Sequence, residues 1–324
     1  MNYWKDKKVL VTGGCGFLGS YLTEELVAVG AIVTVVDNLE SGSLDNIAAV
    51  RSKITFVLAD LCQIDVCKKV SKEAEVIMNL AAFVRGVGYS SKHHGEMLYK
   101  NTTIQLNMLE AARINNVDRF LAVSSSCIYP DNSKAPISEL STTHGLPESS
   151  NAGYGWSKRI AELQAGYYSK EYGIKTAIVR PTNICGGRYP WWGENDSFVM
   201  PTLVKKIMDG NEEVLVWGNG LQSRNFLHAR DVSRLFMLII ENYACGTPVN
   251  VGYENDITIK DLVELICEIT QKSPKIIFDE TKPSGCLRKC VDSTLLRGIT
   301  NSYKPRISLE ETIQEMIVWY GKTF

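Results

Sequence analysis

The sequence predicts an α/β fold: a Rossmann-type doubly wound parallel sheet followed by a smaller C-terminal lobe. Through the first half, apolar segments of strand length alternate with segments of helical periodicity, as in parallel sheets covered by helices on both faces. After residue 181 the chain changes to short elements separated by Gly, Trp, Pro and Asn. We therefore expect a first domain over 1–181 and a second lobe over 182–324, with parts of 224–252 packing back on the first domain.

The first strand, 9–11, leads into glycines at the spacing GxxGxxG, Gly13, Gly16 and Gly19, and then into a helical pattern over 17–29. Such a turn points backbone N–H groups at one spot, and the helix N-terminus adds partial positive charge there. Gly13 permits the tight turn, Gly16 lets a phosphate approach the backbone, and Gly19 lets the helix pack on the strand. The turn therefore suits a pyrophosphate, although a glycine triplet alone also occurs in other α/β turns.

The next two strands strengthen this interpretation. Residues 32–36 form an apolar strand that ends in Asp37. An acid there can accept both ribose hydroxyls of adenosine and would repel a 2′-phosphate, which favours NAD over NADP. A third strand over 54–58 precedes Asp60 and Leu61, a pair that could hold an adenine ring. We predict NAD as the cofactor.

The remaining elements are expected in the following order. Strands lie at 76–79, 119–124 and 176–179, and helices at 97–114 and 152–172. A loop over 184–201 precedes elements at 202–208, 214–217, 231–242, 249–251, 258–270, 276–278 and 309–320.

Composition narrows the class of protein. The chain has 324 residues, 45% apolar content and a net charge of −1, so nothing indicates a nucleic-acid partner. No apolar run reaches the roughly 18 residues that cross a membrane, and the N-terminus lacks the core of a signal peptide. Nine scattered cysteines without a CxxC pair indicate reduced thiols. We expect a cytoplasmic protein without membrane or metal partners.

The strongest chemical signal is the pair Tyr154 and Lys158, which lie four apart on one helical face. Phenol has a reference pKa of about 10, and a nearby ammonium together with an oxidised nicotinamide favours phenolate. Such a phenol can take a proton from a sugar hydroxyl while hydride leaves the same carbon. The strand over 119–124 ends in serines that can share that oxygen. A chance YxxxK on a surface helix is the alternative.

On these residues the chain resembles the extended short-chain dehydrogenase/reductases of the nucleotide-sugar epimerase/dehydratase family, over nearly its whole length. The resemblance implies that Tyr154 is the base, Lys158 orients the nicotinamide ribose and Ser125 assists. It also implies that 1–181 binds NAD and that 182–324 binds substrate. The expected cofactor-binding residues are Gly13, Gly16, Phe17, Leu18, Asp37, Asn38, Asp60, Leu61, Leu80, Ala81, Ala82, Asn101, Tyr154, Lys158 and Pro181.

Two subfamilies, GDP-mannose 3,5-epimerase and GDP-L-fucose synthase, are most similar, through the segment 125–130 with the sequence SSCIYP. In both, the cysteine matching Cys127 moves a proton next to a carbonyl. A thiol, with a reference pKa of about 8.5, can do so; a packing role for Cys127 is the alternative. The resemblance implies that arginines grip the sugar-nucleotide diphosphate. The expected substrate-binding residues are Gly86, Val87, Ser126, Asn183, Val199, Arg224 and Arg288.

The chain departs from these subfamilies at two places. Their second acid/base aligns with Phe198, which cannot transfer a proton. Asp37 departs from the NADPH preference of fucose synthases. In addition, the Asp-Glu pair of 4,6-dehydratases is absent, because Ser126 and Cys127 stand at its positions.

We therefore expect an NAD-dependent nucleotide-sugar epimerase that acts through a transient 4-keto sugar, on a GDP-linked hexose or a related sugar. A nucleotide-sugar C4 dehydrogenase and a non-catalytic NAD-sensing binding protein are the alternatives. The family also implies a homodimer through the helices 97–115 and 152–172.

Overall fold

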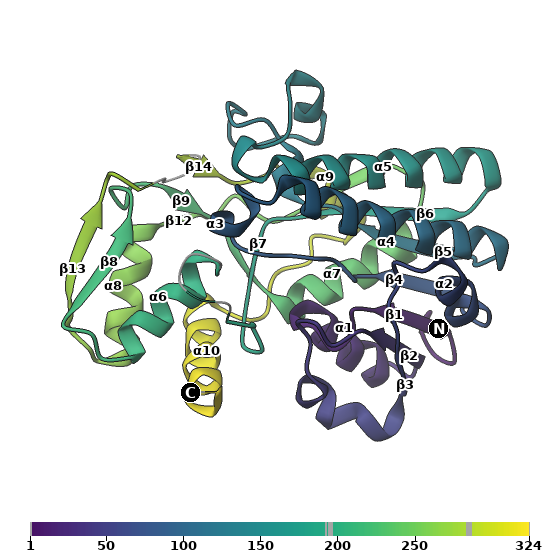
Figure 1. Ribbon diagram of the computed structural model, residues 1–324, viewed down its shortest axis with the longest axis horizontal. Helices are drawn as coiled ribbons and strands as arrows, with labels where there is room; N and C mark the ends of the chain where they lie inside the picture. Colours follow the sequence, from purple (N-terminus) through teal and green to yellow (C-terminus); the bar gives the residue numbers. More distant parts are fainter. Residues whose placement is uncertain (1, 192, 194–196, 283–286, 324) are drawn as a thin grey trace.

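The computed structural model describes residues 2–191, 193, 197–282 and 287–323, and its centre is a seven-stranded sheet (Figure 1). All of its strand pairs are parallel, in the order β11-β6-β5-β4-β1-β2-β3. The strands are β1 (Lys8–Thr12), β2 (Ile32–Asp37), β3 (Thr55–Leu58), β4 (Val76–Asn79), β5 (Arg119–Val123), β6 (Lys175–Pro181) and β11 (Pro248–Val251). The predicted Rossmann-type fold is confirmed.

The order of the strands determines where a ligand can enter. The chain runs outward from β1 through β2 to β3 and then returns to the opposite side of β1 as β4. Thr12 at the end of β1 therefore lies between Val36 and Asn79. Ligands of doubly wound sheets bind at the carboxyl ends of the strands where the order reverses, here between β1 and β4.

Helices cover both faces of the sheet (Figure 1). Val9 and Val11 of β1 pack in one apolar cluster with α1 (Phe17–Ala28) and α7 (Ala229–Asn242). Leu10 points to the other face, because side chains alternate along a strand. There it packs in a second cluster, which involves α2 (Ile64–Ser71), α4 (His94–Ile114) and α5 (Ala152–Tyr172). Strand β1 is thus buried on both sides.

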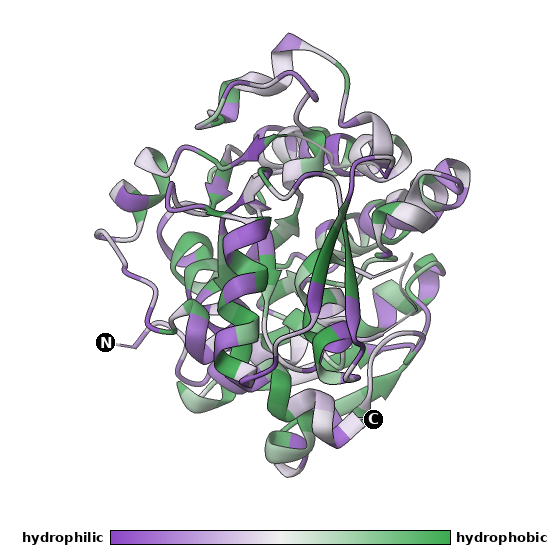
Figure 2. Cartoon of the chain, turned by 90° about the vertical axis from the view of Figure 1, so that its left-hand side faces the viewer, coloured by the Kyte–Doolittle hydropathy of each residue, from purple (hydrophilic) through white to green (hydrophobic). Residues whose placement is uncertain are grey.

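The second lobe has a core of its own (Figure 2). Its helices α6 (Val199–Met208), α8 (Ile259–Thr270) and α10 (Leu309–Thr323) pack with two parallel strands, β8 (Glu213–Trp217) and β13 (Lys275–Asp279). The strand pair β7 (Asn183–Cys185) and β10 (Phe226–His228) lies where the lobe meets α7, beside β9 (Ser223–Arg224), β12 (Ile257–Thr258) and β14 (Arg288–Lys289). The other helical segments are α3 (Val87–Ser90), α9 (Thr294–Ile299) and the 3-10 helices η1 (Leu44–Lys53), η2 (Ser126–Ile128), η3 (Glu139–His144) and η4 (Ser149–Asn151).

Charged and polar contacts fix α1 against the rest of the chain. Glu24 of α1 pairs with Arg188 at 2.6 Å and with Arg230 of α7 at 2.7 Å. Tyr21, also on α1, donates a hydrogen bond to Glu315 of α10. The helix that begins at the glycine turn is therefore tied to the C-terminal helix of the second lobe.

The predicted elements are present with shifted ends, and the structure adds elements that the sequence did not predict, such as α2 and, at the start of the expected 184–201 loop, β7. Helix α6 begins at Val199, three residues before the predicted start, so the end of the expected 184–201 loop is helical. Pro201 lies in the first turn of α6, where proline is tolerated because its N–H would lack an intrahelical partner anyway. Among the helices of the described residues, none has the combination of length and hydropathy that crossing a bilayer requires.

The glycine turn generates a test of the fold. A β-carbon added at Gly19 would lie 2.1 Å from the carbonyl oxygen of Gly13, so Gly19→Ala must displace backbone. We expect the free energy of unfolding in urea to fall by at least about 1–3 kcal/mol. Gly298→Ala in α9 is the matched control, because nothing lies within 4 Å of its added carbon; it should gain about 0.5–1 kcal/mol. Equal stabilities of the two variants would contradict this account.

Candidate active site

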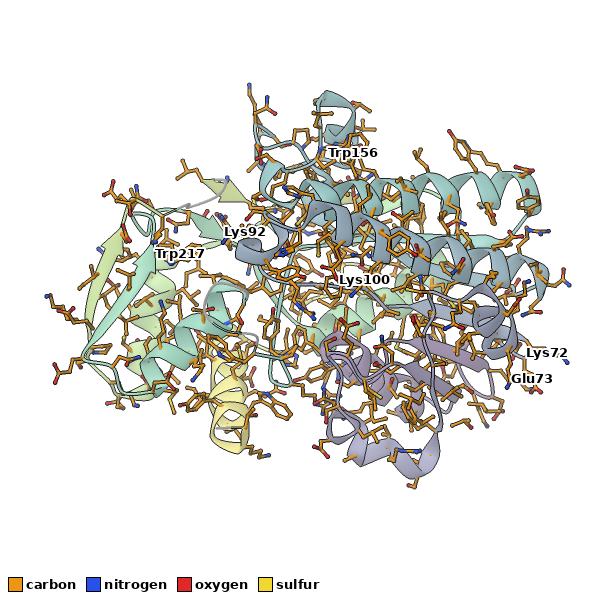
Figure 3. All side chains as sticks on the ribbon, in the orientation of Figure 1. Lys72, Glu73, Lys92, Lys100, Trp156 and Trp217 are labelled. Carbon is orange, nitrogen blue, oxygen red and sulfur yellow. The ribbon has the colours of Figure 1, made fainter. Side chains whose placement is uncertain are left out.

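A cavity of about 710 Å³ opens at the carboxyl ends of the central strands and continues between the sheet and the second lobe. Its lining runs from the glycine turn, past the start of α5, to β8. Figure 3 labels two of its lining residues, Lys100 on α4 and Trp217 at the end of β8, which lie on different parts of the molecule. The volume is in the range of ligand and cofactor sites.

At the end of the cavity next to the glycine turn, two backbone segments approach so closely that a side chain would not fit between them. Gly13 has a φ of +66°, and a β-carbon there would lie 2.9 Å from the backbone of Ala81. Thr12 Oγ1 donates to Asn79 Oδ1 at 2.7 Å and accepts from the Ala81 N–H at 3.0 Å. The turn after β1 and the loop after β4 are thereby held together, and their backbones line the cavity as a pyrophosphate cradle requires.

Asp37 lies at the end of β2 beside this turn. Its carboxylate accepts hydrogen bonds from the N–H groups of Cys15 at 2.9 Å and Leu39 at 2.8 Å. Burial raises the pKa of the Asp37 carboxyl, and these hydrogen bonds oppose that rise. The backbone thus fixes an acceptor at the place where the ribose hydroxyls of a dinucleotide are read, and the residues present fit NAD.

All but one of the predicted cofactor residues line the cavity. Those that line it are Gly13, Gly16, Phe17, Leu18, Asp37, Asn38, Asp60, Leu61, Leu80, Ala81, Ala82, Tyr154, Lys158 and Pro181. Asn101 does not. Its side chain bonds both backbone groups of Phe83, at 3.0 and 2.9 Å, and the Met97 carbonyl at 2.8 Å. Asn101 therefore shapes the loop after β4 instead of lining the cavity.

Tyr154, Lys158, Ser125 and Cys127 lie on one wall of the cavity, as predicted. Lys158 Nζ donates to the Val123 carbonyl at 2.8 Å and lies 5.3 Å from the centre of the Tyr154 ring. Ser125 Oγ accepts a hydrogen bond from the Cys127 N–H at 3.2 Å and lies close enough to the Tyr154 phenol to lower its pKa. The helix can approach because Gly155 has no β-carbon, which would lie 2.7 Å from the Cys127 carbonyl oxygen.

The chain alone does not produce the expected fall in the pKa of Tyr154. Burial raises the pKa of the phenol, nearby Cys127 raises it further, and nearby Ser125 lowers it by less. Burial also lowers the pKa of Lys158 to about 8. In the protein without cofactor, the loss of water around the Tyr154 phenol therefore raises its pKa more than the Lys158 ammonium lowers it. The positive charge needed to lower this pKa has to come from a bound cofactor.

The substrate end contains most of the predicted residues, with two corrections. Val87, Ser126, Asn183, Val199 and Arg224 line the cavity. Gly86 does not line it and stands at the N-cap of α3. The predicted substrate residue Arg288 does not line it either; its exposed guanidinium pairs with Asp256 at 2.9 Å.

The correction at Arg288 follows from strand geometry. Arg288 and the next residue, Lys289, form β14 beside β9, where Lys289 pairs with Arg224. Successive side chains of a strand point to opposite faces, so Lys289 lines the cavity and Arg288 faces away.

Phe198 lines the cavity. By the resemblance it stands at the position where the two subfamilies have their second acid/base. It precedes α6 as the N-cap, is 40% exposed and packs its ring 5.6 Å from that of Tyr189. The histidines nearest in sequence to the predicted site do not replace it. His93 stacks on Tyr89 at 3.9 Å and His94 accepts the Gly153 N–H at 3.3 Å.

Sequence reasoning missed an ion pair in the cavity between Glu148 and Lys289. Lys289 Nζ lies 2.9 Å from Glu148 Oε2, and the two side chains are 13% and 14% exposed. Both line the cavity, as does Cys127, and the Glu148 N–H donates a hydrogen bond to the Cys127 carbonyl at 3.1 Å. The partners are 141 positions apart, so no local pattern signals the pair. Among the described residues, no group of three His, Cys, Asp or Glu side chains could hold a metal ion.

Comparisons with known proteins agree with this arrangement. A model of the NAD dependent epimerase/dehydratase family matches residues 9–252. The protein named probable GDP-L-fucose synthase 1 of Oryza sativa subsp. japonica is 30% identical over 98% of this chain and 92% of its own length. GDP-mannose 3,5-epimerase 1 of Oryza sativa subsp. indica is 28% identical over 98% of this chain and 83% of its own length. The structure of UDP-glucose 4-epimerase from Thermotoga maritima with UDP-glucose superposes with a TM-score of 0.87, at 26% identity, over 98% of this chain and 99% of that chain.

The burial of Lys158 predicts a pH-dependent stability. Its folded pKa of about 8 lies below the ordinary 10.5, so between these values the unfolded chain binds a proton that the folded chain lacks. Stability conferred by this group therefore rises with pH across that window. Lys158→Met should be more stable than wild type at pH 7, by up to roughly 3 kcal/mol, and the difference should shrink toward pH 10.5.

Urea unfolding at several pH values measures this difference. Lys170→Met, on the exposed last turn of the same helix, is the matched control and should change stability little. A gap between Lys158→Met and wild type that stays constant from pH 7 to 10.5 would contradict the assignment.

Proposed function

The chain belongs to the NAD-dependent epimerase/dehydratase family, and on this premise we propose that it is a nucleotide-sugar epimerase that acts through a transient 4-keto sugar. Its cofactor is NAD. The observation that carries the proposal is the single cavity wall on which Tyr154, Lys158, Ser125 and Cys127 meet, between the glycine turn and Arg224. NAD held at the glycine turn and beside Asp37 would supply hydride transfer: acceptance from the sugar carbon and later return.

The residues of the wall divide the work of the first step. Tyr154 takes the proton from the sugar hydroxyl as the carbon is oxidised. Ser125, which lines the cavity beside the phenol, shares the sugar oxygen while its charge develops. Lys158 is fixed by the Val123 carbonyl and supplies positive charge close to the ring. A carbonyl at C4 acidifies the neighbouring C–H bonds, and Cys127 exchanges a proton there.

We propose a GDP-linked hexose or a related sugar as substrate. Two relatives with names that refer to GDP-sugars are 30% and 28% identical to this chain over 98% of its length. Arg224 lines the substrate end of the cavity, and guanidinium groups bind phosphate oxygens bidentately. Asn183 is oriented beside it by a hydrogen bond from its amide to the Asn225 carbonyl at 2.9 Å.

Phe198 limits what this site can do. Inversion of a carbon by proton exchange needs removal on one face and delivery on the other. Cys127 can serve one face, and Phe198 has no proton to transfer on the other. We therefore propose that the enzyme inverts at most one carbon by proton transfer, or only C4 by hydride transfer, and is not an efficient 3,5-epimerase.

Incubation with a panel of sugar nucleotides in deuterated water, followed by NMR, tests this function. We expect an epimer of one nucleotide sugar with deuterium at no more than one ring carbon. Cys127→Ala should abolish that label while oxidation at C4 persists. Tyr154→Phe should reduce turnover by about 10²–10⁴-fold with nucleotide binding retained.

The same experiment separates the alternatives. Accumulation of a ketosugar without an epimer indicates a C4 dehydrogenase, and binding of NAD without any conversion indicates a sensing protein. Stoichiometric deuterium at both C3 and C5 would refute the argument from Phe198.

We also propose that the protein is a cytoplasmic homodimer through α4 and α5. Exposed apolar side chains recur on these helices: Tyr99 and Leu106 on α4, and Trp156, Leu163 and Tyr167 on α5. Their spacings of seven and four place them on one face of each helix. All the cysteines in the described ranges are free thiols, which suits a reducing compartment.

Leu163→Glu tests the dimer. Leu163 is 57% exposed, so a charge there is tolerated by a monomer but disrupts an apolar interface. Sedimentation should give a dimer for wild type and a monomer for the variant. Leu58→Glu, at a 64% exposed position on β3, is the control and should remain dimeric. A monomeric wild type at micromolar concentration would overturn the proposal.

A further inference from the structure

Two ion pairs cross the cavity at its end next to the glycine turn. Glu40 Oε1, in the loop 38–43 after β2, lies 3.6 Å from Arg85 Nη2 and 3.5 Å from Lys100 Nζ. Arg85 belongs to the loop 80–86 after β4, and Lys100 lies on α4 (Figure 3). All three side chains line the cavity. We call these two ion pairs the Glu40 bridge.

The strand order places the Glu40 bridge across the glycine turn. Strands β2 and β4 lie on either side of β1, so a contact between the loops that follow them passes over the carboxyl end of β1. The same two loops also contact the turn itself. A β-carbon at Gly13 would lie 2.9 Å from the Ala81 backbone, and the Ser43 N–H donates to the Cys15 carbonyl at 3.0 Å. The turn, the two loops and the bridge therefore surround one section of the cavity, at the place where a pyrophosphate fits.

The two cations of the bridge share one buried aromatic partner. The centre of the Phe83 ring lies 4.4 Å from Arg85 Cζ and 4.0 Å from Lys100 Nζ, and a cation over an aromatic face is attracted to it. Asn101 bonds both backbone groups of Phe83, and Glu96 pairs with Lys100 at 3.0 Å. The positions of both cations are therefore set by α4 and by the loop after β4.

The carboxylate of the bridge follows a strained residue. Leu39 has a φ of +59°, in the left-handed region that residues with a β-carbon seldom adopt. Its N–H donates to the Asp37 carboxylate at 2.8 Å, and the Glu40 N–H donates to Asn38 Oδ1 at 3.1 Å. Strain of this kind persists only where the surrounding contacts impose it, and it is typical of ligand clamps. The loop that carries Glu40 is therefore held in one conformation directly after the ribose acceptor Asp37.

We propose that the Glu40 bridge is a gate that closes over NAD and slows its exchange with solvent. Separation of Glu40 from Arg85 and Lys100 opens the gate and lets the dinucleotide enter or leave. The three side chains are 44%, 14% and 32% exposed, respectively, and ion pairs as exposed as these are weak enough to open. The purpose of the gate rests on the proposed function, because an epimerase with a transient 4-keto sugar must keep its reduced cofactor until the hydride has been returned.

A gate differs in its kinetics from a direct effect of these charges on NAD. Glu40 is an anion beside a pyrophosphate site, so by charge alone its removal would slow the release of NAD. Arg85 and Lys100 are cations, so if they only bound phosphate their removal would speed release alone and weaken equilibrium binding to the same extent. Loss of a gate instead raises the rates of association and dissociation together, and the Kd changes much less than either rate.

Stopped-flow fluorescence of the full chain measures both rates without any sugar. Association is followed on mixing with NADH, and dissociation on mixing the NADH-loaded protein with excess NAD. In Glu40→Gln, which removes both ion pairs, we expect both rates to rise about 5- to 30-fold. Lys100→Gln removes one pair and should raise both rates by less. Glu75→Gln is the matched control and should leave both rates unchanged, because Glu75 is 43% exposed and pairs with Lys7 at 2.7 Å but does not line the cavity.

Salt supplies a second readout. Partly exposed ion pairs are screened by salt, so the gap between wild type and Glu40→Gln should narrow as NaCl is raised from about 0.05 to about 1 M. The double variant Glu40→Gln/Lys100→Gln should resemble Glu40→Gln, because the first change already removes the bridge.

Four outcomes decide the proposal. Slower release of NADH from Glu40→Gln would overturn the gate and show that Glu40 only repels the cofactor. Faster dissociation alone, with the Kd weakened to the same extent, would overturn it in favour of a direct contact, and so would unchanged rates in both single variants. Lys100→Gln decides alone if Glu40→Gln does not fold. Absence of conversion of any sugar would instead overturn the proposed function, and the exchange rates would still decide whether the gate exists.

Discussion

The rest of the structure depends on two close backbone approaches, of α1 to the turn at Gly13 and of that turn to Ala81, which leave no room for a β-carbon at Gly19 or Gly13. A β-carbon at Gly19 would lie 2.1 Å from the Gly13 carbonyl oxygen, and one at Gly13 would lie 2.9 Å from the Ala81 backbone. These approaches set the position of α1 against β1 and of the loop after β4 against both. The cavity, the place of Asp37 and the packing of α7 on α1 follow from that arrangement.

Removal of the reactive side chains from water is the second physical effect that shapes the site. Tyr154 and Lys158 are buried together, and burial moves the pKa of each toward its neutral form. The same effect acts on Cys127, but there the Glu148–Lys289 pair supplies two opposing charges close by. Burial therefore makes both the phenol and the thiol of the wall less acidic, and the Glu148–Lys289 pair acts on the thiol with opposite signs.

The sequence predicted the fold and most of the site because both depend on local patterns. Apolar runs and glycines located the strands and the turn around Gly13, and the spacing of Tyr154 and Lys158 placed them on one helical face. Arg288 does not line the cavity, and a strand of two residues gives no periodicity from which to choose a face. Glu148 escaped notice because its partner lies 141 positions away, and the pKa of Tyr154 depends on burial, which no spacing expresses.

The central sheet is completed late. Strand β11 pairs with β6 only through residues 248–251, and α7 covers one face of the sheet with residues 229–242. During synthesis on the ribosome, a nascent chain that ends at residue 181 already contains β1 to β6 but leaves Val9, Val11 and their neighbours without the apolar cover that α7 provides. Residues 1–181 are therefore not a complete folding unit by themselves. This apolar face of the sheet stays exposed to chaperones or to aggregation until about 70 residues beyond residue 181 have emerged.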